Sequence, residues 1–139
     1  MSERIESPLA WKLIVGLAPI GLIFAALTIT GSLPGASATR WTALGLLAVV
    51  GLTIGLRAPG RSFRHGLVGG FLVALVAIET QALFLGTYFA NNPEYMDIEM
   101  PFGLAPRLAT ALLGPLNAIL AGLVVGLIAA LVARYDRFR

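Results

Sequence analysis

The sequence contains no cysteine, and His65 is the only histidine among its 139 residues. Without cysteine the chain has no disulfide framework, no thiolate metal site and no redox-active pair. A single histidine cannot supply bis-histidine haem ligation or a three-ligand zinc site. The sequence also lacks a GxSxG, HExxH or glycine-rich phosphate-binding motif. We therefore expect no cofactor, no metal ion, no catalytic residues and no enzymatic activity.

Charged residues are also scarce. They make up 12% of the chain, against 58% hydrophobic residues, and the mean hydropathy is +0.87. These few charges cannot supply the polar surface that a water-soluble domain of this size needs. The formal net charge is +3, but the ten cations border apolar runs, so we expect no nucleic-acid partner. The composition predicts an integral membrane protein surrounded by membrane lipids.

Four apolar runs are candidates for membrane-spanning helices. About 20 helical residues are needed to cross the hydrocarbon core of a bilayer. The second run is the shortest and spans only if Arg40 and Arg57 extend toward the headgroups. Pro19 and Pro115 are expected to kink their helices. We predict an all-α fold with one four-helix transmembrane domain over residues 1–139, with spans at about 9–30, 41–57, 66–90 and 106–133.

The first run has an alternative interpretation as a cleaved signal peptide, because Ala36, Ser37 and Ala38 form a small-residue cleavage pattern. However, the apolar region of a signal peptide has only about 7–15 residues, and the segment before it is positively charged. Here the apolar region is longer and the preceding segment is neutral overall. We therefore expect an uncleaved span.

Arginine and lysine are distributed unevenly over the segments outside the spans. Eight of the ten lie in the two terminal segments and in the second loop, while the first and third loops hold one each, Arg40 and Arg107. The positive-inside rule places cation-rich segments in the cytoplasm. We therefore expect two cytoplasmic termini and a short extracytoplasmic interfacial segment between the third and fourth spans. The expected location is the inner (plasma) membrane of a prokaryote.

Two segments outside the spans are candidates for binding. The second loop is expected to contact anionic lipid headgroups. The third loop is acidic and is a possible docking surface for an extracytoplasmic partner, and Asn92 and Pro93 are expected to start a short helix in it. The headgroup residues are Arg57, Arg61, Arg64 and His65, and the docking residues are Glu94, Tyr95, Asp97 and Glu99.

Glu79 is an acidic residue inside an apolar run. Within a span of residues 66–90 it lies near the middle of the bilayer, where an ionised carboxylate costs at least ~2.5 kcal/mol. Every lysine and arginine lies at a span end or outside the spans, so we expect Glu79 to be protonated, hydrogen-bonded or facing water. It is either the titrating group of a proton or cation carrier, or a structural hydrogen bond between helices.

Gln81 and Asn117 are the other polar residues predicted to be functional within the membrane. Asn117 is expected either to bond a carbonyl freed by Pro115 or to pair with Glu79 or Gln81. Gln81 lies about 160° from Glu79 around the third span. Either this span is central in its own fold, or one of its faces meets another chain. We favour the second explanation, which predicts an oligomer or a larger complex.

Small residues recur at helical spacing in the third and fourth spans. In the fourth span they recur every four residues, a pattern that allows helix backbones to approach closely. The pattern does not distinguish contacts within the chain from contacts between chains. The predicted packing residues are Gly66, Gly70, Ala74, Gly114, Ala118, Gly122, Gly126 and Ala130.

These observations favour a non-catalytic accessory or scaffold subunit that packs through small-residue helix faces against other transmembrane subunits or copies of itself. The alternative is a small oligomeric proton- or cation-coupled transporter in which Glu79 titrates. In its number of spans the chain resembles the small multidrug transporters, which also have one membrane glutamate. In that family, however, the glutamate lies in the first span, whereas Glu79 lies in the third.

Overall fold

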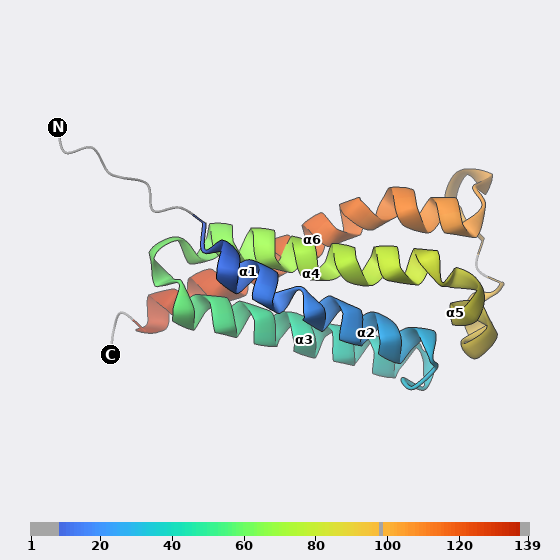
Figure 1. Cartoon of the computed structure of the whole chain (residues 1–139), viewed down its shortest axis with the longest axis horizontal. Helices are drawn as coiled ribbons and strands as arrows, with labels where there is room; N and C mark the ends of the chain where they lie inside the picture. The colour runs from blue at the N-terminus through green and yellow to red at the C-terminus, as the bar shows by residue number, and fades with distance from the viewer. Residues whose placement is uncertain (1–8, 98, 137–139) are drawn as a thin grey trace.

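The computed structural model describes residues 9–97 and 99–136 of the chain. Within these residues every regular element is helical (Figure 1). Three short 3₁₀ turns lie in the connections, η1 (Pro59–Arg61), η2 (Pro93–Tyr95) and η3 (Pro101–Gly103). The α-helices are α1 (Trp11–Leu17), α2 (Pro19–Ile29), α3 (Gly35–Arg57), α4 (Ser62–Leu83), α5 (Leu85–Asn91) and α6 (Pro106–Asp136).

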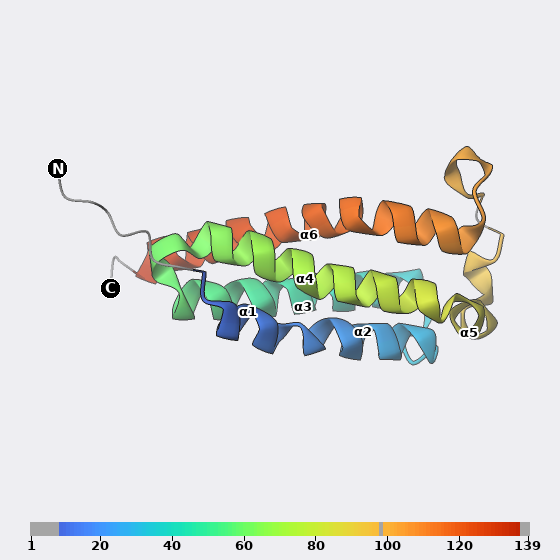
Figure 2. The same cartoon turned by 45° about the horizontal axis from the view of Figure 1, so that its top comes forward.

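Four helical segments are long and apolar enough to cross a membrane, which confirms the predicted number of spans and suggests an integral membrane protein. They are Trp11–Ile29, Gly35–Arg57, Ser62–Leu83 and Pro106–Tyr135. The segments lie side by side (Figure 1, Figure 2). One end of the bundle holds the start of α1, the α3–α4 connection and the end of α6, and is named the terminal end. The other holds the α2–α3 connection, α5, η2 and η3, and is named the loop end.

The first span consists of two helices, α1 and α2. The break falls at Ala18, directly before Pro19, where the sequence predicted a kink. Proline lacks an N–H group and is favoured at the first position of a helix. A Cβ atom on Gly21, in the first turn of α2, would fall on the carbonyl oxygen of Val73 in α4. The backbones of α2 and α4 therefore lie in direct contact.

Helix α4 is the central helix of the bundle. It packs against α1, α2, α3 and α6, and most extensively against α6. Helices α2 and α3 are consecutive in the chain but hardly touch each other. The buried apolar cluster joins α1, α3, α4 and α6, and it consists of Leu17, Val50, Ile54, Val73, Val125 and Ala129.

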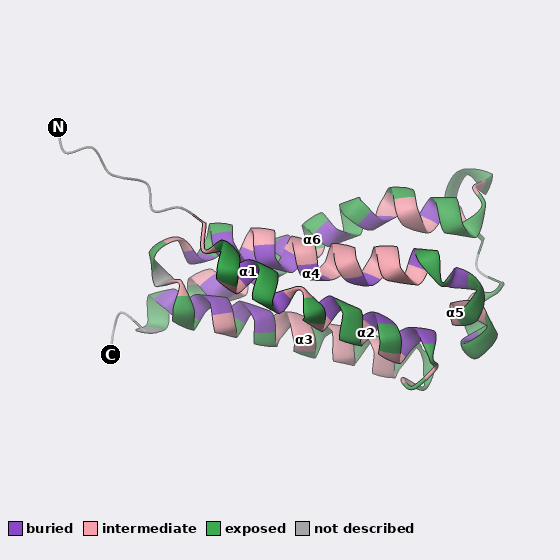
Figure 3. Ribbon diagram, viewed as in Figure 1, coloured by how far each residue is buried: buried purple, intermediate pink, exposed green. Residues whose placement is uncertain are grey.

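Burial along α3 is uneven, with buried residues toward the terminal end and none toward the loop end (Figure 3). On α3, the buried residues are Val50, Gly51, Ile54 and Gly55, all in the half of the helix that leads to the terminal end. No residue from 35 to 49 is buried. The first half of α3 therefore has little contact with the rest of the chain.

The third span ends earlier than the sequence indicated. Helix α4 starts at Ser62 and stops after Leu83, where Phe84 leaves helical geometry with φ −103° and ψ 28°. The expected span continued to residue 90, but Leu85–Asn91 forms the separate helix α5, which turns away from the axis of α4 (Figure 2). This boundary changes the position of Glu79 relative to the ends of its helix.

Helix α6 is a single α-helix of 31 residues that continues through Pro115. Membrane helices tolerate internal proline because neighbouring groups can satisfy the backbone carbonyl that loses its partner. The helix crosses α4 along its length, so that its two halves lie on different sides of α4 in Figure 1.

Candidate functional site

The glycine residues of α4 and α6 lie directly against each other. A Cβ atom on Gly66 would lie 2.7 Å from the Cα atom of Gly126, and one on Gly70 would lie 3.0 Å from the Cα atom of Gly122. A Cβ atom on Gly122 would lie 2.5 Å from the carbonyl oxygen of Leu67. Only glycine permits backbones to come this close. These predicted small-residue faces therefore form a contact within the chain.

The other small residues predicted for packing also lie among the chain's own helices. Ala118 is fully buried, and the Cα atom of Gly114 lies beside the side chain of Glu79 on α4. Ala74 lines a cavity between helices, and Ala130 is half-buried. Within the described residues, the small-residue series of α6 is used largely for packing against the chain's own helices.

The two polar side chains of α4 point in opposite directions, as the helical spacing predicted. Gln81 Nε2 donates a hydrogen bond of 2.7 Å to Thr28 Oγ1 on α2. Glu79 lies on the side of α6, where a Cβ atom on Gly114 would be 2.9 Å from Glu79 Oε1. Both neighbours belong to the same chain because α4 is central in its own fold. The opposite directions of these side chains therefore do not require a second chain.

Glu79 lies one helical turn from the loop end of α4, not near the middle of the span. Leu83, the last residue of α4, lies four positions further on, about 6 Å along the helix axis. Glu79 is half-buried and makes no hydrogen bond or ion pair with the described residues. No buried side-chain nitrogen or oxygen of these residues lacks a partner, so the Glu79 oxygens must reach the surface of the bundle.

A group of hydrogen bonds ties α2 to α4 and α5 at the loop end. Thr28 Oγ1 accepts from Gln81, and Asn92 Nδ2 donates to the carbonyl oxygens of Thr28 and Tyr88, each at 2.8 Å. Thr28 and Asn92 are both buried. This role is not evident from the sequence, because Thr28 lies in an apolar run and Asn92 is expected to start a short helix. The only hint in the sequence is that Thr28 and Asn92 are polar residues near the ends of two spans that meet at the same end of the bundle.

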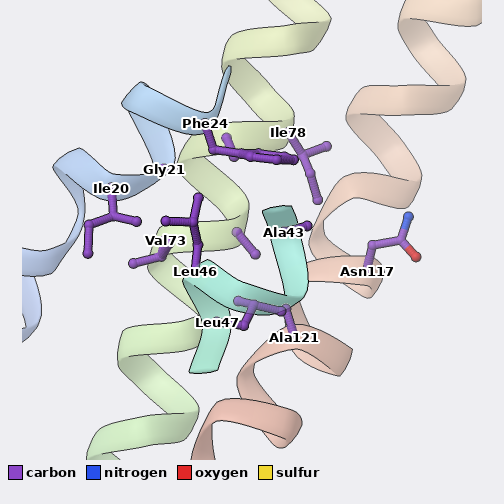
Figure 4. A pocket seen from close by; sticks show the side chains of 12 residues that line it. Ile20, Gly21, Phe24, Ala43, Leu46, Leu47, Val73, Ile78, Asn117 and Ala121 are labelled. Atoms are coloured by element: carbon purple, nitrogen blue, oxygen red, sulfur yellow. The ribbon is translucent and has the colours of Figure 1, made fainter. Parts of the chain in front are cut away.

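A cavity of about 180 Å³ lies between α2, α3, α4 and α6, beside the loosely packed half of α3 (Figure 4). Its lining is apolar apart from Asn117 and includes Phe24, Leu47 and Ile78. Apolar cavities do not hold water, since water needs two to four polar partners. The chemistry of this lining suits an apolar group, such as part of a lipid acyl chain.

Asn117 lies at the edge of this cavity. Its side chain is exposed and makes no hydrogen bond with the described residues. In Figure 4 its amide points away from the apolar side chains of the cavity. Neither expected partner, a carbonyl freed by Pro115 or the side chain of Glu79 or Gln81, is bonded to it. The structure therefore does not join the three predicted polar residues into one site.

At the loop end, the predicted docking residues divide into two groups. Glu94, Asp97 and Glu99 are exposed. Tyr95 instead packs against Tyr88, with ring centroids 5.7 Å apart. Burial, together with the nearby Tyr95 and Glu94, raises the pKa of Tyr88 from 10.0 to about 12. Of the four predicted docking residues, the three carboxylates are thus the exposed ones.

The basic residues of the second loop are not equally accessible. Arg57 and Arg64 are exposed, and Arg61 is half-buried. His65 is buried, and its Nδ1 atom lies 2.8 Å from the carbonyl oxygen of Arg61. His65 therefore stabilises the start of α4, and the exposed arginines are the groups that can reach lipid headgroups.

The chain matches no protein-family model, no curated protein and no solved structure. Across residues 9–97 and 99–136, no three histidine, cysteine, aspartate or glutamate side chains lie close enough together to hold a metal ion. Function must therefore be argued from the positions of the polar side chains in the bundle.

Proposed function

We propose that this protein is a non-catalytic accessory or scaffold subunit that packs in the membrane against other transmembrane subunits or copies of itself. One observation carries the proposal. Glu79 and Asn117 lie on membrane-spanning helices, yet neither has a hydrogen-bond partner among the described residues.

Polar side chains that face hydrocarbon lose the hydrogen bonds that water would give them. A polar group on a neighbouring helix can replace those bonds, and such a contact is worth about 0.6–2 kcal/mol. Asn117 lines the cavity of Figure 4 whereas Glu79 does not, so the two groups face different surroundings. A chain with helices of other subunits around it satisfies both groups better than a chain surrounded by lipid alone.

The interface we propose differs from the one that the sequence suggested. The small-residue faces of α4 and α6 are largely used within the chain, so they are not available to a partner. The surfaces of α4 and α6 around Glu79 and Asn117 take their place.

We also infer that the terminal end faces the cytoplasm and that the loop end lies outside the inner membrane of a prokaryote. The positive-inside rule supports this orientation. Among the described residues the terminal end carries four exposed cations, whereas the loop end carries three exposed carboxylates and two exposed arginines, Arg40 and Arg107. The four cations are Lys12, Arg57, Arg64 and Arg134, and the carboxylates are Glu94, Asp97 and Glu99.

Native mass spectrometry after extraction in a mild detergent tests the proposed assembly. We expect this chain with other membrane proteins in fixed stoichiometry, or with further copies of itself. Glu79→Leu should weaken the assembly about threefold to thirtyfold, whereas Glu79→Gln keeps a hydrogen-bonding group and should preserve it. Thr53→Val is the matched control, because the Thr53 hydroxyl bonds only the Val49 carbonyl of its own helix. A wild-type protein that is always a lone monomer would contradict the proposal.

Cross-linking gives a second test, because the chain has no native cysteine to interfere. Leu83 lies one turn after Glu79 on the same face of α4, and its side chain is 72% exposed. Leu83→Cys should therefore form cross-links to a partner chain in membranes. Leu22→Cys on α2, at a residue that is 51% exposed, serves as the control on another surface. Equal cross-linking at both positions would argue against an interface beside Glu79.

The same glutamate variants separate this proposal from proton-coupled transport. If Glu79 titrates during transport, Glu79→Gln abolishes pH-driven flux in proteoliposomes. Loss of flux in Glu79→Gln together with unchanged assembly in Glu79→Leu would favour the transporter and overturn the accessory role.

A further inference from the structure

A groove at the terminal end separates α1 from α3. It has a volume of about 530 Å³. The α1 side is lined by Lys12, Leu13, Gly16 and Leu17, and the α3 side by Thr53 and Arg57. Lys12 and Arg57 are both exposed, and no acidic residue of the described chain lines the groove.

Below its two cations the groove is apolar and open. Leu17 is part of the buried core cluster, and Leu13 packs against that cluster. A Cβ atom on Gly16 would have nothing within 4 Å, so the space beside this residue is unfilled. The groove therefore combines a cationic mouth, at the end of two spans, with an apolar interior that runs into the membrane.

We propose that this groove binds one anionic phospholipid. Its phosphate lies between Lys12 and Arg57, and an acyl chain extends along Leu13, Gly16 and Leu17. Neither cation has a hydrogen bond or ion pair with the described residues. Thr53 already donates its hydroxyl hydrogen to the Val49 carbonyl at 2.8 Å, so the two cations are the donors that the groove offers to a ligand.

Charge complementarity selects the kind of lipid. Two cations that line one groove repel each other, and an anion between them removes this repulsion. The guanidinium and ammonium groups both form charge-assisted hydrogen bonds with phosphate oxygens. A zwitterionic headgroup would bring a further cation into a groove in which the described residues place no carboxylate to receive it. Basic pockets between membrane helices are known to bind anionic headgroups in this way.

The test is native mass spectrometry of the full chain titrated with phosphatidylglycerol or with phosphatidylcholine. We expect one phosphatidylglycerol molecule to be retained in preference to phosphatidylcholine. Lys12→Gln and Arg57→Gln should each weaken this binding about fivefold, since a cation near an anionic headgroup contributes on that order. Lys12→Arg should keep it. Arg40→Gln is the control, because Arg40 is an exposed arginine on α3 at the loop end.

A second variant tests the acyl-chain part of the groove without changing its charge. Gly16→Leu places a side chain in the unfilled space and should prevent retention of phosphatidylglycerol. Leucine is favoured over glycine in a helix, and its Cβ atom would have nothing within 4 Å here, so the variant should fold, which circular dichroism checks. Inorganic phosphate should not displace the lipid, because it lacks the acyl chain. Displacement by phosphate, equal binding of phosphatidylcholine, or full retention by the Lys12→Gln, Arg57→Gln double variant would overturn the proposal.

Discussion

At the scale of single residues, glycine sets the distance between α4 and α6. Gly66 and Gly70 on one helix face Gly122 and Gly126 on the other, with no room for a Cβ atom between them. Helix association in membranes depends on close packing, because lipid tails are as apolar as the side chains themselves. The contact between these glycines is therefore a main source of stability for the bundle.

We predict that Gly122→Ala lowers the free energy of unfolding by about 1–3 kcal/mol, because the new Cβ atom would push the two helices apart. The atom would lie 2.5 Å from the carbonyl oxygen of Leu67. Gly45→Ala in α3 is the matched control. Nothing lies within 4 Å of that Cβ position, so the change should be neutral or stabilising. The free energy of unfolding of both variants is measured in mixed micelles with increasing dodecyl sulfate, with circular dichroism as the signal. An equal loss of stability in Gly122→Ala and Gly45→Ala would contradict this prediction.

Tyr88 gives a prediction about alkaline pH. Burial and its neighbours Tyr95 and Glu94 raise the pKa of its phenol from 10.0 to about 12. The folded protein therefore keeps this proton between pH 10 and 12, while the unfolded chain loses it, so stability from Tyr88 is full below pH 10 and declines through this window. Phenolate absorbance is titrated against pH in the wild type and in Tyr88→Phe, and the difference between the two curves reports Tyr88. This difference should have its midpoint near pH 12. A midpoint near pH 10 would show an ordinary, solvated phenol.

At the scale of helices, the sequence was sufficient to predict four spans and the break before Pro19. It placed the end of the third span wrongly because Phe84, Leu85 and Phe89 continue the apolar run past Leu83. The helix stops where hydrogen bonds to α2 begin, and those bonds join residues 53 to 64 positions apart in the chain. Local hydropathy carries no information about such bonds. The same difference puts Glu79 one turn from the end of α4 instead of near the middle of the expected span.

Helix α3 should differ in stability between its two halves. Residues 35–49 have no buried member, whereas Val50 and Ile54 belong to the core. Local opening requires less free energy where fewer apolar contacts are lost. Hydrogen exchange measured by mass spectrometry in nanodiscs should therefore proceed faster in the first half of α3 than in the second. If exchange is instead uniform along α3 and as slow as in the middle of α4, the prediction is wrong, and a partner or a lipid covers the first half of α3.

At the scale of the whole molecule, the sequence indicated that the third span has two polar sides but not which neighbours cover them. Hydropathy does not report which helices pair, and the small-residue pattern fits contacts within or between chains equally well. The structure supplies both neighbours from the same chain, α2 and α6. The remaining argument for a partner comes from Glu79 and Asn117, whose lack of bonded neighbours could not be read from residue types.

The orientation of the molecule leads to a labelling experiment. Glu94→Cys at the loop end should react with a membrane-impermeant maleimide in intact cells, whereas Arg64→Cys at the terminal end should react only after the membrane is opened. Both native side chains are exposed, and the chain has no other cysteine. The reverse pattern of labelling would contradict the positive-inside orientation.

The central position of α4 also has a consequence for how the protein is made. The first two spans hardly touch each other, so during synthesis they have no compact structure until the third span arrives between them. The glycine face of α4 then stays uncovered until α6, which follows it in the chain, has been synthesised. Biogenesis therefore depends on α6, and a nascent chain that stops before it would expose this face to chaperones and membrane proteases.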